Sequence, residues 1–583
     1  MVRRSMQRVK LAQNGPTSTS MTPTPPSYRR DSLRDDLLAA AIVAVLLIPQ
    51  SIAYALLAGL PPQVGLYASV LPLVAYALVG ASSLNAVGPA AVLALMTLQA
   101  IAPLAGQVDL SAAAVVLAAE VGLLLAAAAV LKLDALAALL SAPVLQGFSV
   151  GAAISIALSQ LPALLGSPAH GVHLRALVDS WVESSRAGAW LHPTTAAFGV
   201  SSLVVLLVAR RHLQPLAARW LSTDLAKLVA RAAPLVVIAI ATGLAWAFAA
   251  PSHGVTVVGP LPTLHLPLAL PLFDAELWLL LLPSAALLAL VTFVSSFAVA
   301  ERLGLQRGEH VDGRRELAGL AAANLAAGVS GGMPVGGSFS RSALNAEAGA
   351  RTRWAGAWTA LFLALAALLL AAPLAWLPRT VLAATIVVPV LAAAEWKAFG
   401  LAWRYTRGEA ALMGLVAAIT VLHTAQWALG VGVLISIALM LQHAARPHAA
   451  LIGRVPGTEH YRNVTRYATE LTPGVLSLRV DESLLFVNAR QLPGVVAKHL
   501  DAYPDTRRVV LQMTPVNRID LSGLEALSTL QTVLRERGIR LDLSEVKGPV
   551  LDGLRAAQWS SWFAGRIYLS HHQAVRDEQG MAP

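Results

Sequence analysis

The sequence predicts a polytopic α-helical membrane protein, with fourteen spans in a seven-plus-seven inverted repeat, that ends in a small α/β domain. Of its 583 residues, 56% are hydrophobic and only 13% are charged, which is about half the charged fraction of soluble domains. Stretches without Asp, Glu, Lys or Arg recur until about residue 445, and the composition becomes more polar after about residue 460. Most of the chain therefore belongs in a lipid bilayer.

The first 32 residues are rich in Ser, Thr, Pro, Arg and Lys and contain few large apolar side chains. This composition predicts a disordered cytoplasmic tail over residues 1–32. The tail lacks an apolar stretch followed by a cleavage site, so we do not interpret it as a signal peptide. Leu37 to Leu60 contains no charged residue. That length is enough to cross a ~30 Å hydrocarbon core at ~1.5 Å per residue.

Similar stretches continue through a transmembrane domain that we assign to residues 33–445. The expected spans are residues 37–57, 64–80, 88–103, 112–131, 143–165, 193–209, 232–250, 277–300, 318–330, 338–349, 355–377, 380–394, 410–425 and 428–444. The third and the tenth are short, and they follow Gly88–Pro89 and the glycine-rich segment 331–337. Short, interrupted spans at corresponding places in two halves are typical of transporters whose helices break near the membrane midplane. Their positions predict the inverted repeat.

The last charge-free stretch, Ala410 to Ala445, is 36 residues long, and its length does not by itself distinguish one span from two. This stretch is short for two full spans and long for one. We expect two short spans that turn near residues 426–430. A single span would instead place the C-terminal domain on the outer side.

The charges sort by membrane side. The chain has 43 Lys and Arg against 32 Asp and Glu, a net charge of +11. With the tail inside, only Arg175, Arg186 and Arg379 fall in outer loops. Sixteen basic residues fall in expected cytoplasmic loops: Lys132, Arg210, Arg211, Arg219, Lys227, Arg231, Arg302, Arg307, Arg314, Arg315, Arg351, Arg353, Lys397, Arg404, Arg407 and Arg446. This positive-inside bias explains the basic excess without nucleic acid, which we do not expect as a partner.

Several classes of active site are excluded or unsupported. The chain contains no cysteine, which excludes disulfides, thiolate metal sites and cysteine nucleophiles. We find no Ser/His/acid order, metal-ligand cluster or phosphate-binding glycine loop. We therefore expect neither an enzyme nor a cofactor or metal site.

The C-terminal α/β domain is assigned to residues 463–575, after a linker at 446–462 and before a tail at 576–583. Apolar patterns predict strands at 475–480, 484–487, 508–513 and 539–543. Helices are expected at 490–500, 522–537 and 550–557. Strands that alternate with helices indicate an α/β fold.

The motifs of the membrane domain resemble the sulfate permease (SulP) family, and the resemblance extends over about residues 33–570. It rests on Ile48-Pro49-Gln50-Ser51-Ile52-Ala53-Tyr54-Ala55, Ala58-Gly59-Leu60-Pro61-Pro62, Val87-Gly88-Pro89, Ser141-Ala142-Pro143-Val144 and Gly337-Ser338-Phe339-Ser340-Arg341-Ser342. The C-terminal domain resembles the STAS domain that these permeases carry. The resemblance implies a homodimeric anion transporter in which a core domain of four plus four spans moves against a gate domain. The high Ala and Arg and low Lys contents are typical of a GC-rich bacterial source, so we expect a multi-pass protein of the inner membrane. The charge bias predicts that its N-terminus and STAS domain lie in the cytoplasm.

The half-helices of spans three and ten are suited to hold an anion. Two helix N-termini that meet near mid-membrane each present unpaired N–H groups and about half a positive charge. Gly88 and Gly337 would allow the backbone to approach a ligand closely. Arg341 adds a full charge, and an intramembrane arginine is a functional candidate by default. The alternatives for Arg341 are a salt bridge to an acid or a position in a loop.

By resemblance, the substrate pocket lies between spans one, three, eight and ten. Gln50 and Tyr54 would line it from span one, and Ala90 would line it from span three. The stretch that contacts the anion in span ten is Ser338, Phe339, Ser340 and Arg341. Neutral donors such as Gln50 and Ser340 can replace an anion's hydration without binding it too tightly. The alternatives are a helix–helix hydrogen bond for Gln50 and packing for Tyr54.

Two positions bear on coupling to a cation. Where many family members have a carboxylate in span eight, this chain has Ser295, which cannot titrate and offers one weak oxygen ligand. Glu301 lies six residues further on, near the cytoplasmic end, and does not replace that acid. Glu120 is an acid inside the fourth predicted span. It is a replacement proton carrier, a partner for Arg341 or another buried cation, or the sign of a misplaced membrane boundary.

The STAS-like domain also departs from its relatives. Asp520 lies in a turn that resembles the turn of bacterial regulatory STAS proteins in which a phosphorylated serine follows the aspartate. In this chain the residue after Asp520 is Leu521. We therefore expect no control by phosphorylation at this position. We interpret the domain as an assembly, folding or regulatory module, with a STAS-binding protein as a further possible partner.

Together these observations predict a secondary transporter, a symporter or antiporter, for small inorganic or carboxylate anions. Sulfate, bicarbonate, chloride, molybdate and dicarboxylates all remain candidates. The alternatives are an anion channel or an electromechanical protein that binds chloride without a full transport cycle, and a membrane-bound enzyme or receptor. Because of Ser295, we expect anion flux to be insensitive to Na⁺.

Overall fold

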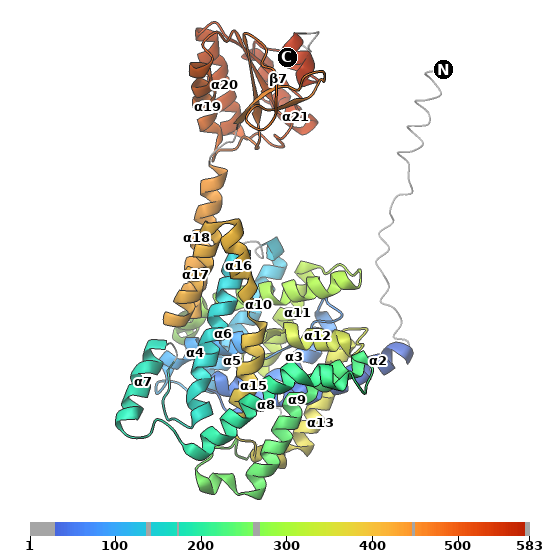
Figure 1. Cartoon of the computed structure of the whole chain (residues 1–583), viewed down its shortest axis with the longest axis vertical. Helices are drawn as coiled ribbons and strands as arrows, with labels where there is room; N and C mark the ends of the chain where they lie inside the picture. Colours follow the sequence, from blue (N-terminus) through green and yellow to red (C-terminus); the bar gives the residue numbers. More distant parts are fainter. Residues whose placement is uncertain (1–29, 136–140, 172–173, 261–268, 446–448, 578–583) are drawn as a thin grey trace. The chain divides into compact units, whose positions relative to one another are not determined.

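The computed structural model describes residues 30–135, 141–171, 174–260, 269–445 and 449–577 (Figure 1). Most of the expected N-terminal tail and residues 578–583 of the C-terminal tail lie outside the described residues. The chain divides into two compact units, Met1–Leu434 and Ile435–Pro583. The first unit is helical, and the second contains the α/β domain.

A helix covers each of the fourteen stretches expected to span the membrane. These helices are α2 (Arg30–Leu57), α3 (Pro62–Val79), α4 (Ala91–Ile101), α5 (Leu110–Val130), α6 (Ala142–Leu165), α8 (Pro193–Ala217), α9 (Thr223–Ala247), α10 (Ala275–Gln306), α11 (Gly313–Val329), α12 (Phe339–Glu347), α13 (Trp354–Leu369), α15 (Arg379–Ala393), α17 (Arg407–Leu422) and α18 (Ala425–Ala444). In the described part of the chain, eight helices are long and apolar enough to cross a membrane by themselves. The count of fourteen crossings and the inverted repeat stay predictions.

Two short helices were not expected: α7 (Leu174–Arg186) and α16 (Trp396–Tyr405). Their charged residues kept them out of the apolar pattern that identified the spans. The span expected at 355–377 is divided into α13 and the short helix α14 (Ala371–Ala375). The turn between the last two helices falls at His423–Thr424 rather than at 426–430. Ala425 already starts α18, and it is fully buried, so the apolar run resumes earlier than expected.

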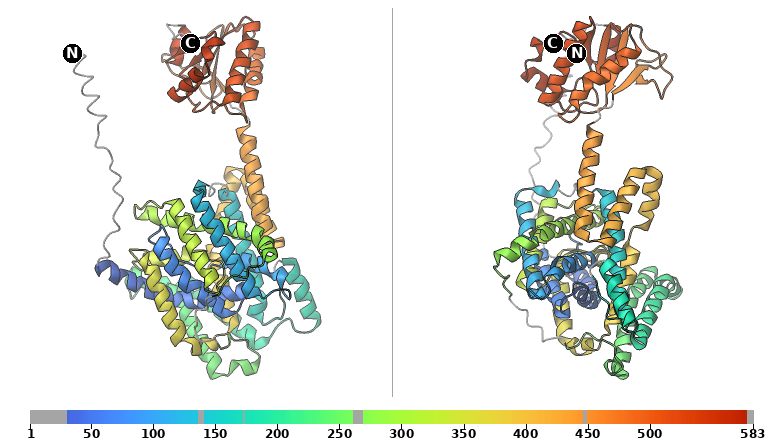
Figure 2. Two further views of the ribbon diagram at one scale, coloured as in Figure 1. Left: turned by 180° about the vertical axis from the view of Figure 1, so that it is seen from behind. Right: turned by 90° about the vertical axis from the view of Figure 1, so that its left-hand side faces the viewer.

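The helices of the first unit pack in two groups (Figures 1 and 2). The first group contains α2–α5 and α10–α13, and the second contains α6, α8, α9, α15 and α17. Within the first group α11 lies against α3 and α5, and within the second α6 lies against α15 and α17. Contacts between the groups, such as α2 with α15 and α4 with α6, are less extensive. In the order of the expected spans, the first group comprises spans one to four and eight to eleven.

Close helix contact depends on small residues. A Cβ added to Gly122 on α5 would lie 2.8 Å from Leu325 on α11, and one added to Gly328 on α11 would lie 3.3 Å from Ala119. In lipid, where the hydrophobic effect does not drive helices together, such small residues let van der Waals packing do so. These contacts also fix the register of α5 and α11, which run antiparallel.

A short strand pair joins the two halves of the first group. β1 (Val87–Gly88) and β2 (Gly336–Gly337) are antiparallel, with Val87 opposite Gly337 and Gly88 opposite Gly336. α4 begins three residues after β1 ends, and α12 begins two residues after β2 ends. The N-termini of the two half-helices are therefore held near the same point.

The C-terminal unit contains a six-stranded sheet with the order β4-β3-β5-β6-β7-β8. β5 to β8 are parallel, and β3 pairs with β4 and β5 antiparallel. The strands are β3 (Ala449–Arg454), β4 (Tyr461–Asn463), β5 (Val475–Val480), β6 (Arg508–Gln512), β7 (Arg540–Ser544) and β8 (Ile567–Tyr568), and the helices are α19 (Leu492–Ala502), α20 (Leu521–Glu536), α21 (Gly548–Ala556) and α22 (His571–Arg576). A buried apolar core joins α19, α20 and α21 to the sheet.

Three features of this unit differ from expectation. β3 and most of β4 lie in residues 446–462, which were expected to form a linker, and they pair with the sheet of the domain. Residues 484–487 are not a strand of the sheet, because Leu484 makes only an isolated bridge to Ile519; its apolar pattern reflects core burial. β8 and α22 were not predicted, because they are too short to show a periodic pattern in the sequence. Asp520 caps α20 by accepting a hydrogen bond from the Gly523 N–H, at 2.9 Å.

Candidate anion-binding site

The half-helices α4 and α12 present unpaired backbone donors. The first intrahelical bond of α4 runs from Ala94 N–H to Ala90 O (2.8 Å), and that of α12 runs from Ser342 N–H to Ser338 O (2.8 Å). The N–H groups before Ala94 and Ser342 therefore have no carbonyl four residues back. Neither Ala90 nor Ser338 supplies a side-chain cap. The two N-termini together form a region of positive potential.

Arg341 connects the two strands from which these helices start. Its Nε donates to Ala86 O at 3.0 Å, its Nη1 to Pro89 O at 3.0 Å, and its Nη2 to Gly336 O at 3.4 Å. The residue is only 4% exposed. No acidic side chain in the described part of the chain forms an ion pair with it. The two alternatives considered for Arg341, a salt bridge and a position in a loop, are therefore not observed.

Gly88 lies directly against the Arg341 guanidinium. A Cβ at Gly88 would lie 3.3 Å from Nη1 and 3.4 Å from Cζ. The glycine thus lets the charged side chain of Arg341 approach the backbone of β1. At Gly337 a Cβ would overlap the Asn85 side chain, so this position also requires glycine.

The residues of α2 approach the same region. α2 contacts both α4 and α12, and Gln50 and Tyr54 are half-buried on it. The Gln50 amide has no hydrogen bond to any described residue, so the helix–helix bond considered for it is not observed. Both residues therefore remain candidates to face an anion.

The start of α12 is partly open. Phe339 and Ser340 are exposed, and the Ser338 and Ser340 hydroxyl oxygens are 3.3 Å apart. The Phe339 ring lies 5.1 Å from Arg302 Cζ on α10, in a cation–π contact. Ala90 is half-buried in extended conformation just before α4. The structure thus brings all the predicted residues of spans three and ten to one place.

A buried hydrogen-bond network, which sequence reasoning missed, supports this place. Glu316 on α11 is fully buried and accepts hydrogen bonds from Tyr76 Oη (2.7 and 2.9 Å) and Asn85 Nδ2 (2.8 Å). Asn85 Oδ1 accepts from Ser342 Oγ (3.2 Å), which accepts from Ala86 N–H (2.9 Å). Glu316 fell just outside the span expected at 318–330, so it was not recognised as buried.

Ser295 and Glu120 lie apart from this network. Ser295 Oγ donates to Val291 O of its own helix at 2.6 Å. Glu120 is the middle residue of the 21-residue α5 and is 2% exposed. Neither carboxyl oxygen has a hydrogen-bond partner among the described residues. A misplaced boundary and a pairing with Arg341 therefore do not explain Glu120.

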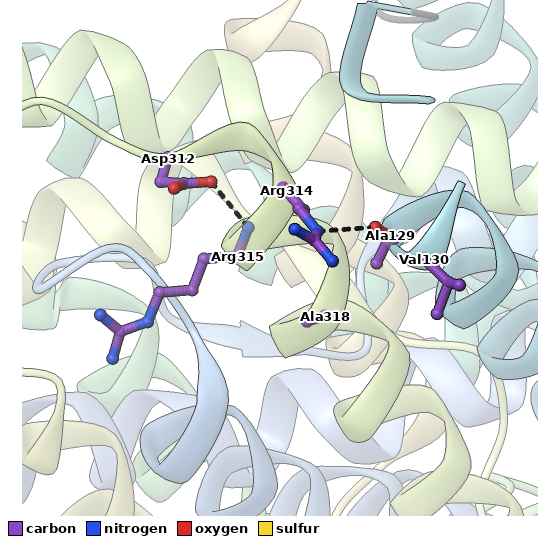
Figure 3. A pocket seen from close by; sticks show the side chains of 6 residues that line it. All are labelled: Ala129, Val130, Asp312, Arg314, Arg315 and Ala318. Carbon is purple, nitrogen blue, oxygen red and sulfur yellow. Dashed lines mark hydrogen bonds between the residues drawn. The ribbon is translucent and has the colours of Figure 1, made fainter. Parts of the chain in front are cut away.

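A cavity lies in a different place (Figure 3). It has a volume of about 300 Å³ and lies where α5 ends and α11 begins; it is lined by Ala129, Val130, Asp312, Arg314, Arg315 and Ala318. Arg314 Nε donates to Ala129 O at 3.0 Å, and Asp312 caps α11 by accepting from Arg315 N–H at 2.9 Å. A cation on the carbonyl end of α5 and an anion at the start of α11 complement the helix dipoles. These contacts stabilise the helix ends.

Comparison with known proteins decides the family. The sulfate permease family model matches residues 33–417, and the STAS domain model matches residues 466–574. The chain belongs to the sulfate permease family. It is therefore a multi-pass membrane anion transporter with a C-terminal STAS domain, and it is not an enzyme.

The similar proteins extend over most of the chain. It is 32% identical to the probable sulfate transporter 4.2 of Arabidopsis thaliana over 567 residues, covering 93% of this chain and 80% of that protein. It is 34% identical to a probable sulfate transporter of Mycobacterium tuberculosis over 545 residues, covering 91% of this chain and 92% of that protein.

Two solved structures share the fold. Murine Slc26a9, an anion transporter in the inward-facing state, matches with a TM-score of 0.83 at 20% identity, covering 98% of this chain and 97% of that chain. The transmembrane domain of the cyanobacterial bicarbonate transporter BicA matches with a TM-score of 0.59 at 21% identity. This match covers 69% of this chain and 98% of that chain.

Proposed function

We propose that this sulfate permease family member is a secondary transporter that binds a small oxyanion between the N-termini of α4 and α12. The observation that carries the proposal is the convergence of two uncapped helix starts around a buried arginine without an ionic partner. Relatives at 32% and 34% identity are described as sulfate transporters, so sulfate is the first anion to test. Bicarbonate, chloride and dicarboxylates are the competing substrates.

Arg341 and the backbone have different roles in anion binding. Three donors of Arg341 are already used by carbonyl oxygens, so the guanidinium acts mainly through its charge and by holding β1 against β2. Direct donors to the anion are the backbone N–H groups of Phe339 and Ser340, the Ser340 hydroxyl and the Gln50 amide. Neutral donors of this kind bind an anion while allowing its release. Tyr54, Ala90 and Ser338 form the surrounding wall.

Transport proceeds by alternating access of the two helix groups. The first group contains the half-helices, and the second packs against it over less extensive contacts. Rigid-body movement between such groups exposes a fixed midplane site to one side at a time. We place the protein in the inner membrane as a homodimer, with its N-terminus and STAS domain in the cytoplasm. A STAS-binding protein is a candidate regulator.

Cation coupling does not use the position in α10 that carries an acid in many relatives. Ser295 donates its hydroxyl hydrogen to Val291 O and offers a cation a single neutral oxygen, whereas Na⁺ prefers several oxygen ligands. Anion flux is expected to be independent of Na⁺. Accumulation driven by a Na⁺ gradient would contradict this part of the proposal.

The proposal is tested with the purified protein in liposomes. Uptake of labelled sulfate, bicarbonate, chloride and succinate is measured with and without an internal counter-anion. A transporter gives saturable uptake that unlabelled substrate inhibits and that an internal anion accelerates. A large, non-saturating conductance would indicate a channel and would overturn the carrier mechanism.

A further inference from the structure

Glu120 differs from the other buried acidic residues because it has no partner among the residues that the structure describes. It lies in the middle of α5, where every residue from Ala113 to Gly122 is buried. Neither of its carboxyl oxygens receives a hydrogen bond from a described residue. Glu316, which is equally buried, provides the contrast, because Tyr76, Asn85 and the Ala81 N–H all donate to its oxygens.

No charge on α11 faces Glu120. The contacts of Gly122 with Leu325 and of Gly328 with Ala119 place Glu120 opposite the segment 325–328. The charged residues of α11 are Arg314, Arg315 and Glu316, all in its first turn. Glu316 precedes Leu325 by nine residues, or roughly 13 Å along a helix at ~1.5 Å per residue.

The other helices that pack on α5 offer no partner either. α10 carries Glu276 in its first turn and Glu301 and Arg302 in its last two turns, and its central part is apolar or hydroxylic. α4 has no titratable residue, and α5 has none besides Glu120. An ionised carboxylate at this level would therefore be desolvated and unpaired, which costs several kcal/mol. A bound proton removes that cost.

We propose that Glu120 is a proton-binding site that is occupied in the conformation described here. The part of the inference that concerns coupling rests on the proposed transport function. Coupling requires the packing within the first helix group to change during the cycle, so that the carboxyl takes up a proton from water on the side where the anion enters and releases it to water on the side where the anion leaves. One proton then moves with each anion, and a divalent anion crosses with a net charge of −1.

The location of Glu120 suits such coupling. α5 packs on α10, α11 and α4, and α4 and α11 carry the half-helix and the Glu316 network of the candidate anion site. Protonation at Glu120 therefore changes the charge of the helix group that holds the anion. The site also supplies the titratable group that Ser295 cannot provide.

The first experiment measures the proton directly, without transport. Infrared difference spectra of the purified full-length protein in lipid are recorded at neutral and alkaline pH, for the native chain, E120Q and E276Q. We expect a carbonyl stretch of a protonated carboxylic acid at neutral pH that E120Q lacks. E276Q, the same substitution at an exposed carboxylate, retains it. Absence of a band that depends on Glu120 would overturn the proposal.

The second experiment tests coupling in proteoliposomes with the membrane potential clamped at zero. With one proton per anion, a gradient of two pH units raises steady-state accumulation by up to about 100-fold, or tenfold per unit. E120Q is expected to lose this accumulation while it retains exchange of labelled against unlabelled anion at equal pH. Undiminished proton-driven accumulation in E120Q would overturn coupling through Glu120. Absence of anion flux in both proteins would instead refute the transport function, while the spectra still decide the proton site.

Discussion

At the scale of single residues, Arg341 combines a charge with a structural role. Its three hydrogen bonds to Ala86, Pro89 and Gly336 fix the crossing of β1 and β2, and its charge is not cancelled by an ion pair in the described residues. Lysine would keep the charge but could not reproduce a planar fork that reaches three carbonyls. The two functions are therefore separable by substitution.

We expect Arg341→Ala to abolish or strongly weaken anion binding while expression persists. Loss of the hydrogen bonds of a charged group reduces the free energy of binding by about 1.5–3 kcal/mol, which corresponds to a roughly 10- to 100-fold lower affinity. Arg341→Lys should bind with intermediate affinity because it keeps the charge. Affinities are measured by scintillation proximity with labelled sulfate or by anion-dependent thermal shift. Unchanged affinity in Arg341→Ala would remove Arg341 from the site.

His571 in the STAS domain gives the domain a pH dependence. The residue is 1% exposed, and its Nδ1 lies 2.8 Å from Ser544 Oγ. Burial lowers the pKa of His571 from 6.5 to about 4, so the neutral imidazole favours the folded state. The stabilisation is complete above pH 6.5 and falls by up to about 1.4 kcal/mol per unit as the pH drops towards 4.

Hydrogen–deuterium exchange of residues 540–577 in the full-length protein measures this loss. Local opening is expected to increase between pH 7 and pH 5, after correction for intrinsic exchange, and His571→Gln should flatten the change. The pKa of Asp577 is lowered to about 2, mainly by hydrogen bonds from Tyr568 and Arg540, so Asp577 contributes no slope in this range. His460→Gln, at an exposed histidine, is the control and should behave like the native protein.

At the scale of elements, the position of α12 depends on polar contacts as well as on packing. Ser342 on α12 receives the Ala86 N–H and donates to Asn85, which in turn donates to Glu316 on α11. Asn345, one turn later, donates to Leu84 O at 3.2 Å. A nine-residue helix buries little surface of its own, so these bonds hold its N-terminus beside β1.

Ser342→Ala is expected to weaken anion binding about tenfold without contacting the anion. Leaving the Ala86 N–H and the Asn85 amide oxygen unsatisfied costs about 1–3 kcal/mol and releases the start of α12. Thr359→Val is the matched control, because it removes a buried hydroxyl from α13 that bonds only to its own helix, at Ala355 O. Equal binding by the two variants would show that the network does not position α12.

At the scale of the whole molecule, the two helix groups are linked by a polar contact. Gln99 on α4 is 5% exposed, and its Oε1 accepts a hydrogen bond from the Ala425 N–H at the start of α18 at 2.8 Å. α18 packs with the second group, since a Cβ at Gly432 would contact Val144 on α6 and Val416 on α17. The bond therefore stabilises the arrangement described here relative to one in which the groups have moved.

Gln99→Leu is expected to shift the conformational equilibrium away from this arrangement. Loss of one buried hydrogen bond, about 1–3 kcal/mol, changes a two-state population by roughly 5- to 150-fold. The chain has no cysteine, so nitroxide labels at Gln107→Cys and Trp427→Cys, both exposed, report the separation of the groups by pulsed electron resonance. An unchanged distance distribution would contradict this role for Gln99.

Much of the fold and part of the site were predictable from sequence. The apolar stretches located all the long helices, because a bilayer requires about 20 apolar residues per span. Glycine and proline at 88–89 and 331–337 located the half-helices because they are clustered there, whereas single prolines such as Pro49 and Pro283 lie inside helices. The sequence did not identify Glu316 as a buried residue, because its burial depends on Tyr76 and Asn85, which are more than 230 residues away in the chain.

Composition and local pattern thus determined the membrane class, the two interrupted spans and the C-terminal α/β domain, and the family resemblance indicated the STAS type and the residues around β1 and β2. Only the tertiary structure decided what those residues do. It shows that three backbone carbonyls hold the Arg341 guanidinium. It also shows that the Glu120 carboxyl has no hydrogen-bond partner among the described residues. The reason is physical: whether a buried charge is paired depends on neighbours that folding brings from distant parts of the chain, and no local pattern records them.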